Sequence, residues 1–143
     1  MYKSFIDTNI WIYAFTETEK DIEKHSSITH FLEELKSKSN ILISVQVLNE
    51  FHWTLKRKYK IEETAIREKV QDGILQVCEV IPLDLQCYKK ACEIRDEYNV
   101  SFWDSLIIAA ALSQNCELLY SEDMHHGQKI EDKLTIQNPL IGH

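Results

Sequence analysis

Glycine and proline are scarce in this chain, whose 143 residues include three glycines and two prolines. Linkers and disordered tails are usually rich in these residues, so the composition favours an ordered globule with many helices. No apolar run approaches the roughly 20 residues that a membrane-spanning helix needs, and the N-terminus lacks the basic-then-apolar pattern of a secretory signal. We therefore expect one domain over residues 1–143, located in the cytoplasm and without a membrane segment.

Paired cysteine motifs are absent as well. The four cysteines form no C-x-x-C pair, and no histidine stands at zinc-ligand spacing from them; they are Cys78, Cys87, Cys92 and Cys116. In a reducing compartment such cysteines behave as small hydrophobic residues. We therefore expect neither a structural disulfide nor a zinc site.

A positive net charge, which is usual for proteins that bind nucleic acids, is also missing. The chain has 16 Lys and Arg against 23 Asp and Glu, which gives a net charge of −7. Each divalent cation held by acidic side chains would offset two of these charges, and the overall charge says little about the potential beside a metal ion. The sign of the charge therefore does not exclude a polyanionic substrate.

The spacing of apolar residues predicts strands separated by helices. Ile28, Phe31, Leu32 and Leu35, for example, fall on one helical face. The predicted strands cover residues 2–6, 41–44, 78–83, 117–120 and 133–137, and the predicted helices cover 10–15, 22–35, 45–58, 62–76, 84–98 and 102–112. The last helix is apolar nearly all round and should be buried. This order is typical of an α/β fold with a central parallel sheet of four to five strands and helices on both faces.

Four acidic residues stand where these predicted elements begin or end: Asp7, Glu50, Asp104 and Asp123. Asp7 and Asp123 follow strands, and parallel α/β sheets bind ligands beyond the carboxyl ends of their strands. Carboxylates that gather in one place repel one another unless a cation holds them, and a divalent metal ion is the usual one. The four residues therefore indicate a metal-dependent hydrolase.

Each acid also has a local structural explanation. Asp7 begins an Asp-Thr-Asn cluster typical of a helix N-cap, and Asp104 stands three residues after Ser101, as in a capping box. Glu50 lies at the margin of the apolar face of its helix, where a solvated side chain would also lie. Asp123 is in a polar segment rich in turn formers. No single acid decides between the two interpretations, whereas the set of four favours a shared site.

The set resembles the PIN-domain nucleases, and among them the small VapC-type toxins of toxin–antitoxin pairs. The resemblance extends over essentially the whole chain. It is carried by Asp7-Thr8-Asn9, Asn49-Glu50, the segment from Trp103 to Ala111, and Ser121-Glu122-Asp123-Met124. Each motif is short, so the specificity comes from their order and spacing.

This resemblance implies a PIN-like α/β sandwich whose acidic cluster binds Mg²⁺ or Mn²⁺ and hydrolyses RNA. Under the resemblance, Asp7 and Asp104 are metal ligands, Glu50 and Asp123 complete the catalytic cluster, and Asn9 and Ser121 are polar residues that support it. The resemblance also implies a homodimer, and a cognate antitoxin protein whose tail docks near the active site.

Three other protein classes share parts of this pattern. A haloacid-dehalogenase-type phosphatase also begins with an Asp after its first strand, but it needs a second Asp where this chain has Asn9. A phosphoacceptor receiver domain needs paired acids after the first strand and a late functional Lys, and the sequence has neither. A non-catalytic PIN module that binds RNA or a protein partner stays open as the alternative, although the intact acids disfavour it.

Other features have both a structural and a functional interpretation. The basic run Lys56-Arg57-Lys58-Tyr59-Lys60 ends a predicted helix, where cations complement the helix dipole; a phosphate-binding patch is the alternative. His125 and His126 read as turn residues, with substrate contact as the alternative. For the three tryptophans, core or interface packing is expected in preference to base stacking; they are Trp11, Trp53 and Trp103.

Overall fold

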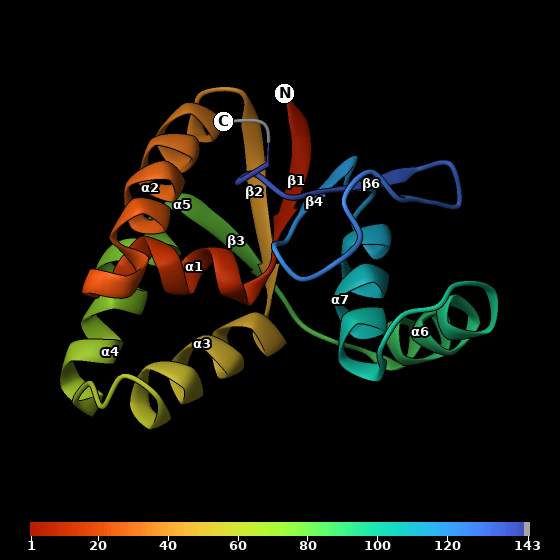
Figure 1. Ribbon diagram of the computed structural model, residues 1–143. Coiled ribbons are helices and arrows are strands. Elements are labelled where there is room, and N and C mark those ends of the chain that lie inside the picture. Colours follow the sequence, from red (N-terminus) through yellow and green to blue (C-terminus); the bar gives the residue numbers. More distant parts are fainter. Residues whose placement is uncertain (142–143) are drawn as a thin grey trace.

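The computed structural model describes residues 1–141, and a six-stranded sheet runs through its centre (Figure 1). The order of the strands in the sheet is β3-β2-β1-β4-β6-β5. The strands are β1 (Tyr2–Ile6), β2 (Ser39–Ser44), β3 (Cys78–Ile81), β4 (Leu118–Tyr120), β5 (Lys129–Ile130) and β6 (Leu134–Gln137). All neighbouring pairs are parallel except β5 and β6, which are antiparallel.

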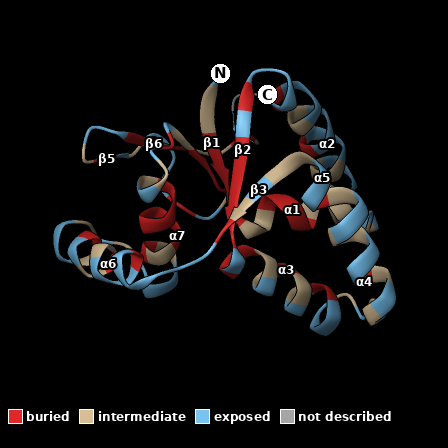
Figure 2. Ribbon diagram, turned by 180° about the vertical axis from the view of Figure 1, so that it is seen from behind, coloured by how far each residue is buried: buried red, intermediate tan, exposed pale blue. Residues whose placement is uncertain are grey.

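Helices cover both faces of the sheet, as the sequence predicts (Figure 1). One face carries α1 (Thr8–Phe15), α2 (Ile22–Lys36), α3 (Val45–Arg57), α4 (Glu63–Lys69) and α5 (Leu75–Val77), and the other carries α6 (Leu85–Glu97) and α7 (Phe102–Ser113). A short 3-10 helix, η1 (Glu19–Asp21), precedes α2. Figure 2 shows that β1, β2 and α7 carry much of the buried core, whereas β3 is mostly intermediate or exposed. Within residues 1–141, no helix combines the length and the apolar character needed to cross a membrane.

The order of the strands reverses between β1 and β4, the two central strands of the sheet. From β1, the chain adds β2 and β3 on one side, and β4 lies on the other side of β1. Phe5 of β1 pairs with Leu42 of β2 and with Leu119 of β4, so β1 is flanked by parallel strands. The Asp7 amide, directly after β1, donates to the Tyr120 carbonyl at 2.9 Å. The carboxyl ends of β1 and β4 therefore lie side by side at a topological switch point, where open α/β sheets bind ligands.

Two predictions about regular structure were wrong. The sheet has six strands, because Lys129–Ile130 forms a short antiparallel strand with β6. The predicted helix over 62–76 is not one regular α-helix, because a π-helical turn, η2 (Val70–Ile74), separates α4 from α5. Gly73 lies in this turn against α1, so close that a Cβ atom there would be 2.6 Å from Cζ of Phe15.

Burial confirms the central position of α7 but not of its first turn. Ile108, Ala109 and Ala110 are fully buried, whereas Trp103 is 61% exposed. Trp11 packs in the core, whereas Trp53 is also 61% exposed. Core packing therefore holds for Trp11 alone of the three tryptophans, and the expected alternative of interface packing stays a prediction for Trp53 and Trp103. The four cysteines are free thiols, and Cys87 and Cys116 are buried like small hydrophobic residues.

Candidate functional site

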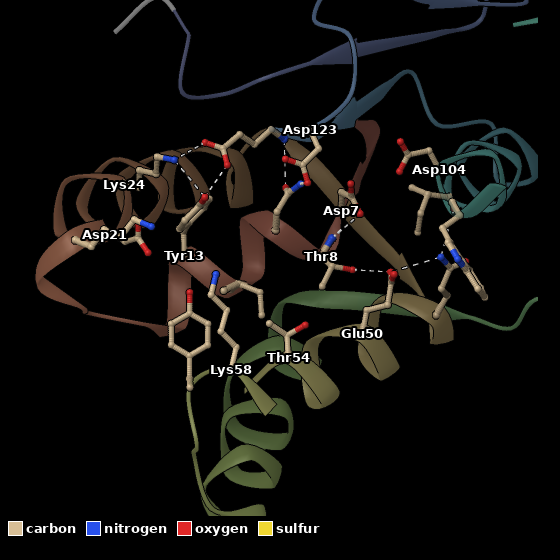
Figure 3. Close-up of a pocket in the computed structure, with 18 residues that line it drawn as sticks. Asp7, Thr8, Tyr13, Asp21, Lys24, Glu50, Thr54, Lys58, Asp104 and Asp123 are labelled. Carbon is tan, nitrogen blue, oxygen red and sulfur yellow. Dashed lines mark hydrogen bonds and ion pairs between the residues drawn. The ribbon is translucent and has the colours of Figure 1, made fainter. Parts of the chain in front are cut away.

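All four predicted acids line one cavity of about 460 Å³ at the carboxyl ends of β1 and β4 (Figure 3). Each comes from a different part of the fold: Asp7 from the β1–α1 junction, Glu50 from α3, Asp104 from α7 and Asp123 from the segment after β4. Helices α3 and α7 lie on opposite faces of the sheet (Figure 1), so the cavity collects carboxylates from both layers and from the sheet itself.

Asp7 is the most buried of the four, at 7% exposure. It is the N-cap of α1, and it accepts hydrogen bonds from the Thr8 amide at 2.7 Å and from the Ser121 hydroxyl at 2.8 Å. Burial raises the pKa of Asp7, the two hydrogen bonds lower it, and the charges of Asp104 and Glu50 raise it; together these effects give a pKa of about 6. Asp7 is therefore both a helix cap and a carboxylate that is costly to ionise in this setting.

Asp104 lies in the first turn of α7 and is half-buried. Its backbone amide donates to the hydroxyl of Ser101, the N-cap, at 3.1 Å, so this part of the predicted capping box is present. Burial raises the pKa of Asp104, the Ser101 hydroxyl lowers it, and the charge of Asp123 raises it. The cap uses the backbone of Asp104, while its side chain lines the cavity.

Thr8 and Gln46, neither of which was predicted as a site residue, hold Glu50. The Thr8 hydroxyl donates to Glu50 Oε1 at 3.0 Å, and Gln46 Nε2 lies 3.4 Å from the same oxygen. Gln46 stands four residues before Glu50 on α3, a spacing that puts both on one helical face. Gln46 Nε2 also lies 3.4 Å from the Trp103 carbonyl, which ties α3 to α7. Its Oε1 is buried and has no hydrogen-bond partner among residues 1–141.

Asn9 and Ser121, the two residues that the resemblance implies as support for the acids, link the two strand ends. Asn9 Nδ2 donates to Asp123 Oδ2 at 3.0 Å, and its Oδ1 accepts from the Glu122 amide at 3.2 Å. The Ser121 hydroxyl, which donates to Asp7, accepts from the Asp123 amide at 3.3 Å. A continuous chain of hydrogen bonds therefore runs from Asp7 to Asp123.

The four carboxylates have the ligand chemistry that a hard divalent cation prefers, but they stand far apart from one another. The carboxylate oxygens are the ligands that Mg²⁺ and Mn²⁺ prefer, and none of the four acids forms an ion pair in the described part of the chain. However, no three His, Cys, Asp or Glu side chains of residues 1–141 stand close enough to hold one ion together. Mg²⁺ usually takes one or two carboxylates and keeps several waters, so such an ion does not require all four acids at once.

Lysines and tyrosines also line the cavity. Lys20, Lys24 and Lys58 line it, together with Tyr13 and Tyr59. Two members of the predicted basic run, Lys58 and Tyr59, therefore reach the cavity. The two histidines of the predicted turn, His125 and His126, are exposed and do not line it.

Glu122 also lines the cavity, and its carboxylate is already paired with a cation. Lys24 Nζ lies 2.8 Å from Glu122 Oε2, and the Tyr13 hydroxyl donates to Glu122 Oε1 at 2.6 Å. These contacts fix α2 and α1 to the segment that carries Asp123. Hydrogen bonds to Glu122 and Tyr13 hold the pKa of Lys24 above its usual range.

The profile of the PIN domain matches residues 4–129 of the chain. Comparison with curated proteins found no match. Among solved structures, VapBC2 of Rickettsia felis is 24% identical, with a TM-score of 0.69, and the match covers 94% of this chain and 97% of that one. VapBC of Salmonella typhimurium is 20% identical, with a TM-score of 0.69 and coverage of 97% and 99%.

A third similar structure is VapC20 of Mycobacterium tuberculosis, described as a toxin that cleaves the sarcin–ricin loop. It is 18% identical, with a TM-score of 0.64, and the match covers 85% of this chain and 90% of that one. These likenesses show a shared fold with its sheet and both helical layers. Together with the profile match over most of its length, they lead to one conclusion: the chain belongs to the PIN-domain family.

Proposed function

We propose that this chain is a metal-dependent endoribonuclease that hydrolyses phosphodiester bonds of RNA. The observation that carries the proposal is the arrangement of four carboxylates from four separate elements around one cavity, without a cationic partner among the described residues. Gathering such charges costs free energy, most of all at the buried Asp7, unless a cation offsets them. Membership of the PIN family supports this reading over the phosphatase alternative.

A divalent ion, Mg²⁺ or Mn²⁺, would supply the positive charge that acidifies a water molecule and stabilises negative charge on the phosphoryl oxygens. Asp7, Glu50, Asp104 and Asp123 are the residues that we propose to hold it and to act in catalysis. Ser121 and the Thr8 amide orient Asp7, and Asn9 orients Asp123. Hydrogen bonds of this kind fix the direction of ligand oxygens. No side-chain nucleophile is required.

Metal-dependent cleavage is the direct test of this function. Purified protein should cleave single-stranded RNA, with total cellular RNA as a first substrate, when MgCl₂ or MnCl₂ is present. EDTA should abolish cleavage, and excess Mg²⁺ should restore it, because in this proposal the metal ion supplies both the acidified water and the charge that stabilises the phosphoryl oxygens. Denaturing electrophoresis measures the products. Equal cleavage in EDTA would contradict the metal requirement, and binding without cleavage would support the non-catalytic PIN module.

We further propose that the chain is the toxin of a toxin–antitoxin pair in the cytoplasm, that it forms a homodimer, and that a cognate antitoxin protein binds it. Structures with the same fold include a toxin–antitoxin complex from Klebsiella pneumoniae. An apolar groove of about 650 Å³ lies next to Glu50 and is lined by Val45, Leu83, Trp103 and Leu106. Three of these side chains are substantially exposed, which is typical of a surface that binds another protein.

Expression in cells tests the toxin role. We expect expression of the chain alone to slow growth, and co-expression of the small protein encoded by the neighbouring gene to restore it. The two proteins should then copurify, since an antitoxin that blocks the cavity must bind the folded toxin. Harmless high-level expression of a fully active nuclease, with no copurifying partner, would contradict the toxin role and leave the nuclease proposal intact.

A further inference from the structure

The cavity has two ends of different charge, and Figure 3 shows them on opposite sides of the hollow. Asp7, Glu50 and Asp104 lie at one end, while Lys24 and Lys58 lie at the other, with Tyr13 between these two lysines. The lysine end is not purely cationic, because Asp21 and Glu122 line the cavity with three lysines, Lys20, Lys24 and Lys58. These five side chains sum to one positive charge, and among residues 1–141 the only ion pair that involves any of them joins Lys24 to Glu122.

Lys24 is already engaged. Its ammonium group pairs with Glu122 at 2.8 Å and donates to the Tyr13 hydroxyl at 3.2 Å. Lys58 and Lys20, in contrast, form no ion pair with residues 1–141, and of these two only Lys58 lies over an aromatic ring. The ammonium group of Lys58 lies 5.5 Å from the centre of the Tyr59 ring. Lys58 is therefore a cation that points into the cavity beside an aromatic ring and keeps its hydrogen-bonding capacity.

The helix dipole does not account for this position of Lys58. The last turn of α3 already has Lys56 and Arg57, which suffice to complement its carboxyl end. Lys56 lies 3.5 Å from Glu63, and the Arg57 guanidinium lies 5.4 Å from the Trp53 ring centre. Neither of them lines the cavity. Of the five residues in the basic run, only Lys58 and Tyr59 face the same hollow as the acids.

We propose that Lys58 and Tyr59 form a subsite for the nucleotide next to the cleaved bond, and that the substrate strand is single-stranded RNA. Lys58 pairs with the phosphate of that nucleotide, and its base stacks on Tyr59. This inference rests on the proposed function, because it requires that the cleaved phosphate lie among the carboxylates. The next phosphate of the strand then lies farther along the cavity, where a lysine can neutralise its charge.

The size and lining of the cavity support a single strand. A volume of about 460 Å³ is in the range of sites that enclose one small ligand. Bases that are not paired can leave the stack of their neighbours and pack on an aromatic side chain, whereas bases in a duplex cannot. Tyr59 is only partly buried, so its ring is accessible from the cavity.

Equilibrium binding tests the subsite separately from catalysis. The probe is a fluorescein-labelled single-stranded RNA of mixed sequence and about ten nucleotides, within the usual range of single-strand sites. The protein carries Asp104→Asn, so that bound RNA is not cleaved, and the buffer contains Mg²⁺. Fluorescence anisotropy is measured at several NaCl concentrations. The variants compared in this background are Lys58→Gln, Tyr59→Leu and, as matched control, Lys56→Gln.

Lys58→Gln should weaken binding by roughly tenfold at low salt, as expected for one lost charge-assisted hydrogen bond. It should also reduce the slope of log K against log [NaCl] by about 0.7, the value for one phosphate contact of a single strand. Tyr59→Leu should weaken binding without changing the slope, because stacking releases no counterion. Lys56→Gln removes the same charge from the same run and should change neither quantity. A duplex of the same sequence should bind more weakly than the single strand.

Several results would overturn the subsite. Equal effects of Lys58→Gln and Lys56→Gln would mean that only overall charge matters. Unchanged RNA binding in Lys58→Gln, together with weaker binding of polyglutamate, would assign Lys58 to an acidic protein. If the protein with intact acids cleaves RNA while Lys58→Gln leaves binding unchanged, the subsite is wrong and the nuclease proposal stands. If that protein neither binds nor cleaves RNA, the proposed function itself fails.

Discussion

Replacing Asp104 with asparagine is expected to reduce RNA cleavage by roughly 100-fold or more, because it removes a negative charge from the proposed metal-binding cluster. The amide keeps the size of the side chain and much of its hydrogen-bonding capacity. The hydrogen bond to Ser101 uses the backbone of residue 104, so the cap of α7 is retained. The fold should therefore survive. Initial rates of cleavage in MgCl₂ and thermal melting by circular dichroism measure the two effects.

Ser101→Ala is the matched control for this substitution. It removes the cap hydrogen bond, which typically costs about 1 kcal/mol of stability, and it leaves the carboxylate of Asp104 in the cavity. We expect Ser101→Ala to lower the melting temperature and to retain activity, the opposite pattern to Asp104→Asn. If Asp104→Asn instead cleaves RNA at nearly the normal rate and only melts earlier, Asp104 serves the helix and not the chemistry.

Replacing Asp7 with asparagine should stabilise the metal-free protein at neutral pH. The pKa of Asp7 is about 6 in the folded chain, against an ordinary value of 3.8. The folded state therefore binds the proton of Asp7 more tightly than the unfolded state does. The stability gained from this protonation is complete below pH 3.8 and is lost as the pH rises to about 6. The difference is on the order of 3 kcal/mol. Asparagine has no charge to desolvate, so the stability of the Asp7→Asn variant should not fall between pH 3.8 and about 6 for this reason.

Adding Mg²⁺ should reverse the order of the two proteins. An ion that binds only the folded state raises its stability by an amount that grows with the logarithm of the ion concentration, about 2.7 kcal/mol at 100 times the dissociation constant. The wild-type melting temperature should rise with MgCl₂, while that of Asp7→Asn should stay nearly constant. Differential scanning fluorimetry in EDTA and in MgCl₂ measures both. An equal response of the two proteins to Mg²⁺ would show that Asp7 is not a ligand.

The parts of the fold that depend on local patterns were predictable from the sequence. Strand β1 was expected at residues 2–6 and occupies Tyr2–Ile6, and the helix expected at 102–112 occupies Phe102–Ser113. Both are marked by apolar runs and by a boundary residue: Asp7 directly follows the strand, and Ser101 caps the start of the helix. The four acids were also predicted to share a site. Their convergence follows from the parallel sheet, since β1 and β4 end at the same edge.

The contacts that the sequence analysis missed depend on packing between distant elements. Thr8 and Glu50 are 42 residues apart and meet only because α1 packs on α3. At Gly73 in the π-helical turn, the ring of Phe15 approaches the backbone closely. Nothing in the local sequence of 62–76 predicts this contact. The turn before β6 places Glu131 and Asp132 at positive φ, although neither glycine nor asparagine marks it. Such features follow from tertiary structure rather than from propensity.

The wide spacing of the four carboxylates along the chain has a consequence for protein synthesis. Asp7 leaves the ribosome first, and Asp123 is among the last elements of the fold to be made. Domains generally fold as units as they are synthesised, and Asp123 is placed by β4, which must insert beside β1. A truncated product that ends before Asp123 therefore lacks the complete proposed site. Interrupted translation of this gene would yield fragments without the complete proposed site, and the proposed nuclease activity would come only from chains that extend beyond that residue.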